Sequence, residues 1–180
     1  MFMFALNENV VYPGYGVARV NRVIERMVGQ HTTHFYELKF LHRDMAILVP
    51  VDNLAAVGVR MLSSPDYVEA VFKMLAVPAH KDLSADGTVS SWNKRNKKYQ
   101  TLLRSGDLIE ISKIYRDLQY LAQTKELSFG ERALLMQTEA LLSEEIAMVA
   151  HGAPEQMVLR LRAVFGHTYT SASKHTMSAL

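Results

Sequence analysis

The chain has 180 residues, of which 49% are hydrophobic, and its formal net charge at pH 7 is +2. This composition is typical of a globular protein with one or two small domains, and the charge excludes a polycation that binds nucleic acid through net charge alone. The sequence has no apolar run of the roughly 18–20 residues that a membrane span needs, and its lack of cysteine excludes disulfides and thiolate catalysis. We therefore expect a cytoplasmic protein with no membrane partner.

The first sixty residues show the alternation that is typical of strands. Five short strands are predicted, at residues 10–12, 17–27, 35–40, 46–51 and 57–60. Pro13 and Gly14 indicate a turn after the first strand, and residues 28–31 indicate a hairpin loop after the second. Pro50 places the fourth strand at an edge or a strand end, because proline has no N–H to donate to a neighbour. The pattern predicts a small antiparallel β-barrel of SH3 or Tudor type over residues 1–62.

From Ser63 onward the apolar residues recur at helical spacing. Helices are predicted near residues 65–75 and 90–104, from Asp107, from Ser128 to about Val149 and from Pro154 to about Phe165, with a loop at 83–87. Ser128 and Glu131 have the spacing of a capping box. The expected fold class is therefore α+β, a barrel followed by an all-α domain of about five helices at residues 63–165. Residues 166–180 are predicted to be a flexible tail.

Two groups of polar residues are interpreted as ordinary surface. His31 and His34 lie three apart on a strand and so face opposite sides, and we predict neither a metal site nor another cofactor. The acidic pair Glu144 and Glu145 is interpreted as a solvated helix face. The sequence has no P-loop, GxGxxG, HExxH or GxSxG motif of an enzyme, so we do not expect catalysis.

The only tryptophan of the chain, Trp92, stands beside its densest positive cluster. That cluster consists of Lys94, Arg95, Lys97 and Lys98, with no acidic residue among them. One interpretation is a core residue at the start of a solvated basic helix, which the statistics favour because a buried tryptophan is the commoner case. The other is a surface for a polyanion, on which the cations hold phosphates while the ring leans on the base steps of an opening duplex. The residues alone leave both interpretations open.

Six motifs follow one another along the chain: VVYPGYGVARV, ILVPVDNLAAVGVR, WNKRNK, SGD, YRDL and LSFGE. Together they resemble the CarD-like family of bacterial transcription regulators, from about Asn7 to Phe165. The resemblance implies a Tudor-like module, found also in transcription-repair coupling factors, that binds the β subunit of RNA polymerase. It also implies a helical domain that contacts promoter DNA at the upstream edge of the −10 element, where the tryptophan stabilises the open bubble.

For DNA, the resemblance implies that Trp92 is the wedge and that basic contacts come from Lys94, Lys97 and Arg132, while Arg95 belongs to the same positive cluster. These residues form one surface only if the helix that starts at Ser128 places its N-terminus near Trp92. The amides of that terminus would then add affinity for phosphate.

For the polymerase, the resemblance implies a contact by Arg26, with Met27 and Val28 beside it on the same strand. Leu48 and Pro50 lie on the neighbouring strand of this expected interface. Some relatives carry a basic residue where this chain has Leu48, so we expect a more apolar patch here. A free edge strand is also able to pair with a strand of the polymerase through its backbone groups.

We therefore expect a monomeric, non-enzymatic transcription regulator. Its barrel would hold RNA polymerase and its helices would hold promoter DNA in the minor groove, largely independently of sequence, so the protein would be nucleoid-associated through the polymerase. Two alternatives stay open. One is an adaptor on the polymerase whose helical domain docks another protein instead of DNA. The other is a small-molecule-binding barrel with a helical cap, which predicts that Trp92 is buried in the helical core.

Overall fold

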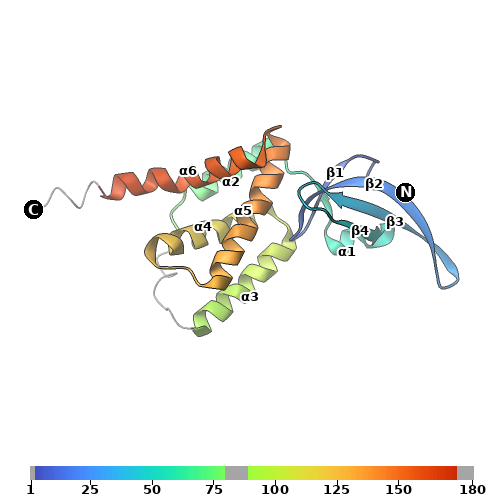
Figure 1. Cartoon of the computed structure of the whole chain (residues 1–180), viewed down its shortest axis with the longest axis horizontal. Helices are drawn as coiled ribbons and strands as arrows, with labels where there is room; N and C mark the ends of the chain where they lie inside the picture. The colour runs from blue at the N-terminus through green and yellow to red at the C-terminus, as the bar shows by residue number, and fades with distance from the viewer. Residues whose placement is uncertain (1–2, 80–88, 174–180) are drawn as a thin grey trace, which may run out of the picture.

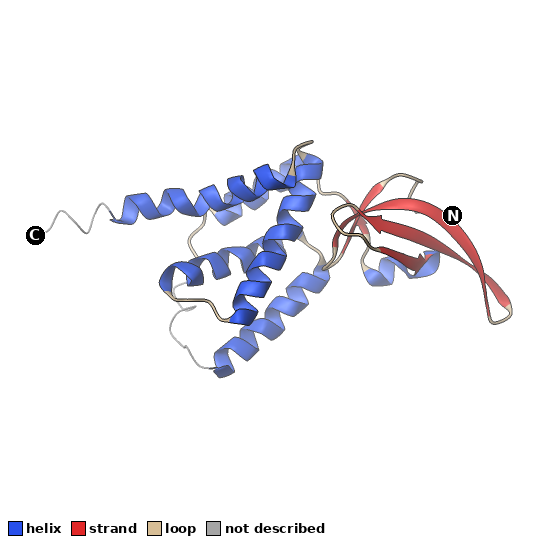
Figure 2. Cartoon of the chain, in the orientation of Figure 1, coloured by secondary structure: helices blue, strands red, loops and turns tan. Residues whose placement is uncertain are grey.

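The computed structural model describes residues 3–79 and 89–173 and confirms the α+β architecture, with a five-stranded antiparallel sheet beside a group of helices (Figure 1, Figure 2). The strands are β1 (Asn9–Tyr12), β2 (Gly16–Val28), β3 (His31–Phe40), β4 (Ala46–Pro50) and β5 (Arg60–Met61). The long helices are α2 (Pro65–Leu75), α3 (Val89–Ser105), α4 (Leu108–Thr124), α5 (Phe129–Val149) and α6 (Pro154–Ser173). The loop predicted at residues 83–87 lies outside the described residues.

The sheet has the strand order β4-β3-β2-β1-β5. Successive side chains of a strand face opposite sides, and the inward set forms the core of this part. Val20, Tyr36 and Leu38 in that core are fully buried. β4 is an edge strand, as Pro50 predicts. The hairpin of β2 and β3 extends past the other strands and projects away from the helices (Figure 1).

The fifth strand begins later than the sequence predicts. Residues Leu54–Val57 form a single helical turn, α1, which follows a 3-10 turn at Val51–Asn53. Gly58 ends α1 in the left-handed conformation, with φ of 81°. The reason is local: the sequence Leu-Ala-Ala-Val forms helix readily, and the glycine after it supplies the positive φ of a helix C-terminus.

Three predicted helix starts are confirmed by their caps. The side chain of Ser64 accepts a hydrogen bond from the Tyr67 amide, and the side chain of Asp107 accepts one from the Glu110 amide. Ser128 opens α5 with both hydrogen bonds of the capping box. In contrast, the last helix was expected to end near residue 165, whereas α6 continues to Ser173. Residues 166–173 include no proline, and their alanine, serine and threonine residues tolerate a helix.

Helix α5 is the centre of the helical part and also its contact with the sheet. All residues from 141 to 147 are buried. The interpretation of Glu144 and Glu145 as a solvated helix face is therefore wrong: they are 7% and 2% exposed. Both carboxylates meet donors from the other part of the molecule, because α5 packs against β2. This contact is the junction between the sheet and the helices.

One ion pair crosses the junction. The guanidinium of Arg60, in β5, donates to both oxygens of the Glu145 carboxylate, from Nη1 at 2.7 Å and from Nη2 at 2.8 Å. The same carboxylate accepts from the amide of Ser63 at 3.0 Å and from its hydroxyl at 2.7 Å. Arg60 also donates to the carbonyl oxygen of Gly106 at 2.6 Å, so it joins the sheet to the loop between α3 and α4.

Close backbone approaches complete the junction. Pro13 lies against Gly58 and Gly106, at which an added Cβ would be 3.3 Å and 3.0 Å from the proline ring. A Cβ at Gly16 would overlap the carboxylate of Glu144, and that carboxylate accepts a hydrogen bond from the Val17 amide. The motifs YPGYG, VGVR and SGD, which are distant in sequence, therefore meet at one place and leave little space between the two parts.

Candidate functional site

Trp92 lies in the first turns of α3 and is partly buried. Its ring packs against the core of the helical part. On α5 it lies over Gly130, where an added Cβ would be 3.2 Å from Cζ2 of the indole. The N-terminus of α5 thus lies near Trp92, which was the condition for the predicted DNA residues to form one surface. The indole is only partly buried. The small-molecule alternative requires an indole that is enclosed in the core, and the structure does not show this.

The contact between α3 and α5 is held by a buried carboxylate, Glu131. It accepts hydrogen bonds from the Ser128 amide at 2.9 Å and from Nζ of Lys125 at 2.9 Å, and its Oε1 lies 3.5 Å from Nη2 of Arg95. Burial raises the pKa of Glu131, but the hydrogen bonds from Lys125 and Ser128 outweigh that effect, and the net pKa is lowered. Glu131 therefore stays ionised at neutral pH and fixes the first turn of α5 beside Trp92.

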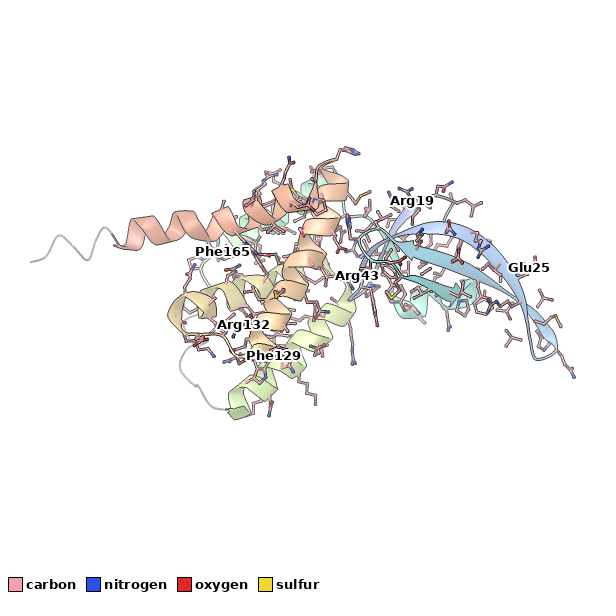
Figure 3. All side chains as sticks on the ribbon, in the orientation of Figure 1. Arg19, Glu25, Arg43, Phe129, Arg132 and Phe165 are labelled. Carbon is pink, nitrogen blue, oxygen red and sulfur yellow. The ribbon has the colours of Figure 1, made fainter. Side chains whose placement is uncertain are left out.

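The predicted basic residues divide into two kinds. Lys94, Lys97 and Arg132 are exposed, so their charges are available to a ligand. Arg132 also donates from Nη2 to the carbonyl oxygen of Leu127 at 3.2 Å, which directs its side chain along the start of α5 (Figure 3). Arg95 is different, because its side chain is only 18% exposed and is paired with Glu131. This pairing gives Arg95 a structural role, and its contact with DNA stays a prediction.

The strand register places most of the predicted polymerase residues on one face of the sheet. Arg26 is opposite Thr33, and Pro50 and Leu48 are opposite Phe35 and Glu37. Residues that are opposite each other share a face, and so do residues two apart on one strand. Arg26, Leu48 and Pro50 therefore share the face that is turned away from Tyr36 and Leu38 of the core. We call this the outer face.

Sequence reasoning missed two residues of the outer face, and one residue of the predicted polymerase contact lies on the opposite face. Ile24 is opposite Phe35, and both are partly exposed on this face between Arg26 and Leu48. The alternation with the buried Tyr36 was the signal that could have found Phe35. Val28 shares the face, but Met27 points to the other side of the hairpin, where it is 69% exposed and accepts a hydrogen bond from the Thr32 hydroxyl.

Two further observations concern other kinds of site. Among residues 3–79 and 89–173, no group of three or more acidic, histidine or cysteine side chains has the arrangement of a metal site. His34 instead lies 2.9 Å from the carboxylate of Glu25. Of the helices in the described part of the chain, none is both long and apolar enough to cross a bilayer.

Comparison with known proteins agrees with this division into two parts. The family model of the CarD C-terminal domain matches residues 71–161, and the model of the CarD-like/TRCF RID domain matches residues 4–63. The chain belongs to the CarD-like family. A Bacillus subtilis (strain 168) protein named "Putative transcription factor YdeB" is 19% identical over 147 residues, which cover 82% of this chain and 92% of that protein.

Membership in the CarD-like family defines the general role. CarD-like proteins are transcription factors and are not known as enzymes, and the RID domain indicates an interaction with RNA polymerase. In this CarD-like chain the RID match covers all five strands, and the C-terminal match covers α3, α4 and α5. The outer face therefore lies in the polymerase-interacting domain, and Trp92 lies in the CarD C-terminal domain.

Proposed function

We propose that this protein is a bacterial transcription regulator that stabilises the promoter open complex. Its barrel binds the β subunit of RNA polymerase, and its helical domain contacts promoter DNA in the minor groove at the upstream edge of the −10 element. The single observation that carries the proposal is the position of Trp92. Its indole rests on Gly130, remains partly exposed, and has the exposed cations Lys94 and Lys97 on its own helix.

The chemistry of this surface suits a junction between paired and melted DNA. Cations hold backbone phosphates and fix the position of the protein, but they carry no preference for melted DNA by themselves. A flat apolar ring beside them gains from contact with an unstacked base, which is worth roughly 1–3 kcal/mol. That preference for the melted form lengthens the life of the open complex about fivefold to more than a hundredfold, since 1.4 kcal/mol is a factor of ten.

The barrel supplies the second contact of the proposal. The outer face offers Ile24, Phe35, Leu48 and Pro50 as an apolar patch with Arg26 beside it, and it adjoins β4, an edge of the sheet. An edge strand accepts an added strand through its backbone groups. Because the barrel holds the protein on the polymerase, a weak DNA contact is sufficient, and effective concentration replaces affinity. Free protein is therefore expected to bind naked DNA weakly.

The test is the half-life of the open complex formed by the cognate polymerase after a competitor is added. Trp92→Ala is expected to remove the stabilisation, with a half-life about tenfold shorter than with the wild type. Changing Lys94 and Lys97 together to glutamate is expected to give a similar loss, which increases when the salt concentration is raised. Neither change touches the barrel, so co-purification with the polymerase serves as the control and should be unchanged.

A second candidate function has one observation in its favour. Met136 is 68% exposed on α5 and, with Leu135 and Phe165, lines a hollow between α4, α5 and α6 that would suit an apolar side chain of a protein partner. In that case the protein is an adaptor on the polymerase. The same experiment separates the two functions, because under the adaptor function the Lys94 and Lys97 changes leave the open-complex half-life intact.

A further inference from the structure

Phe129 is the most exposed large apolar residue in the described part of the chain, with 87% of its surface accessible. It is the first residue of α5 and directly precedes Gly130, the residue under the Trp92 ring. The side chain projects from the end of the helix into solvent (Figure 3). An aromatic ring in that position contributes little to the core and is accessible to a partner outside the chain.

The backbone at Phe129 is fixed, and the ring is therefore presented in a defined place. Ser128 and Glu131, on either side, make both hydrogen bonds of the capping box. Glu131 is in turn held by Lys125 and Arg95. A phenylalanine has only two rotatable side-chain bonds, so little conformational entropy is lost when a partner immobilises it.

The surroundings of Phe129 favour an anionic partner. Arg132, three residues later and so adjacent on the helix surface, is exposed, as are Lys94 and Lys97 on the neighbouring helix. The nearest acids in sequence are Glu126, which is exposed, and Glu131, whose charge is offset by Lys125 and Arg95. The excess of positive charge complements a phosphate backbone and opposes an acidic protein surface.

We propose that Phe129 is a second apolar DNA contact, which lies against a deoxyribose or base edge of the minor groove beside the base that Trp92 meets. Phenylalanine is one of the apolar side chains that minor-groove proteins place against or between base steps. The inference rests on the proposed function and adds a residue from a different helix to it. Two rings from α3 and α5, joined through Gly130, would then form one DNA-facing surface.

The first experiment measures the half-life of the open complex with full-length protein and cognate polymerase. Phe129→Ala is expected to shorten the half-life about threefold to tenfold, while Phe129→Tyr keeps a ring and stays within about twofold of the wild type. Leu159→Ala, which truncates a similarly exposed apolar side chain on α6, is the matched control and is expected to have no effect. The thermal unfolding midpoint should be unchanged, because the Phe129 ring is exposed.

The outcomes separate this inference from the proposed function. A half-life with Phe129→Ala equal to that of the wild type overturns the inference whatever Trp92→Ala does. If Trp92→Ala alone shortens the half-life, only the role of Phe129 is lost, and if neither variant does, the proposed function is lost as well. An equal loss with Leu159→Ala would also overturn the inference, because it would show a general effect of exposed apolar residues.

A second experiment identifies the partner of Phe129 directly. A photo-crosslinking phenylalanine analogue, p-benzoyl-phenylalanine, is placed at position 129 and, as a control, at position 136. Irradiation of the open complex is expected to join position 129 to promoter DNA near the upstream edge of the −10 element and to leave position 136 without a DNA product. A product of position 129 with a polymerase polypeptide and none with DNA would overturn the inference.

Discussion

Glu145→Ala is expected to lower the free energy of unfolding by about 3–5 kcal/mol, the usual cost of removing one member of a buried ion pair. The side chain of Glu145 is only 3% exposed, and its two oxygens accept from Arg60 and from both the amide and the hydroxyl of Ser63. The substitution leaves the Arg60 guanidinium with its bonds to backbone carbonyls but without a counter-charge. It also leaves the Ser63 amide without its acceptor.

The assay is urea unfolding followed by the fluorescence of Trp92, the only tryptophan in the chain. With the urea dependence of about 1–3 kcal/mol per molar that is typical of small proteins, the midpoint should fall by about 1 M or more. Glu69→Ala is the matched control, because Glu69 pairs with Lys73 at 3.0 Å on the solvent-exposed side of α2. Loss of that exposed pair should cost no more than about 0.5 kcal/mol.

A double-mutant cycle with Arg60→Ala then isolates the pair. The two changes together should cost clearly less than the sum of the single changes, with a coupling of about 1–3 kcal/mol. The reasoning would be refuted by a Glu145→Ala variant whose midpoint matches that of Glu69→Ala. Such a result would mean that the junction does not depend on this carboxylate.

Two further predictions concern single atoms of the structure. Gly130→Ala places a methyl group 3.2 Å from the Trp92 ring, so the indole should shift. The expected results are a change in the emission maximum of Trp92 and a shorter open-complex half-life. If both values stay unchanged, the contact between Gly130 and the ring does not position the indole. Burial raises the pKa of the Glu144 carboxyl, so this group stabilises the fold below its ordinary pKa, and that stability is lost as the pH rises through the raised value. The thermal unfolding midpoint of Glu144→Gln should therefore be higher than that of the wild type at about pH 8, and the difference should disappear towards about pH 4.5. A difference in midpoint that stays constant across that range would argue against ionisation of Glu144.

Local signals in the sequence predicted the elements well. Ser64, Asp107 and Ser128 each cap the helix that the spacing of apolar residues indicated, because a cap and its amide partner lie within three residues of each other. Pro50 marked the edge strand for the same reason, since its missing N–H is a property of the residue itself. Leu54–Val57 was the local exception, because no helix was predicted there and Val57 was assigned to the fifth strand.

Contacts between distant parts of the chain were not predicted. Glu144 and Glu145 were assigned to solvent because two adjacent acids usually are solvated, whereas their donors, Val17 and Arg60, lie about a hundred residues away in the sequence. One signal was available: Glu145 is one helical turn after Leu141 and so shares its buried side. In the candidate site, the position of Trp92 over Gly130 needed the tertiary packing of α3 on α5, although the residues themselves were identified from the motifs.

The seating of Pro13 against Gly58 and Gly106 has a mechanical consequence. A flexible linker would let the two parts rotate relative to each other. This junction is instead filled by the Pro13 ring, the buried carboxylates of Glu144 and Glu145, and backbone, so the two parts would stay at a fixed distance from each other. Under the proposed function, the molecule would fit a polymerase only when the fork lies at the matching separation from the β subunit. The protein would not stabilise the open complex of a promoter on which melting begins elsewhere, and this selectivity would need no recognition of base sequence.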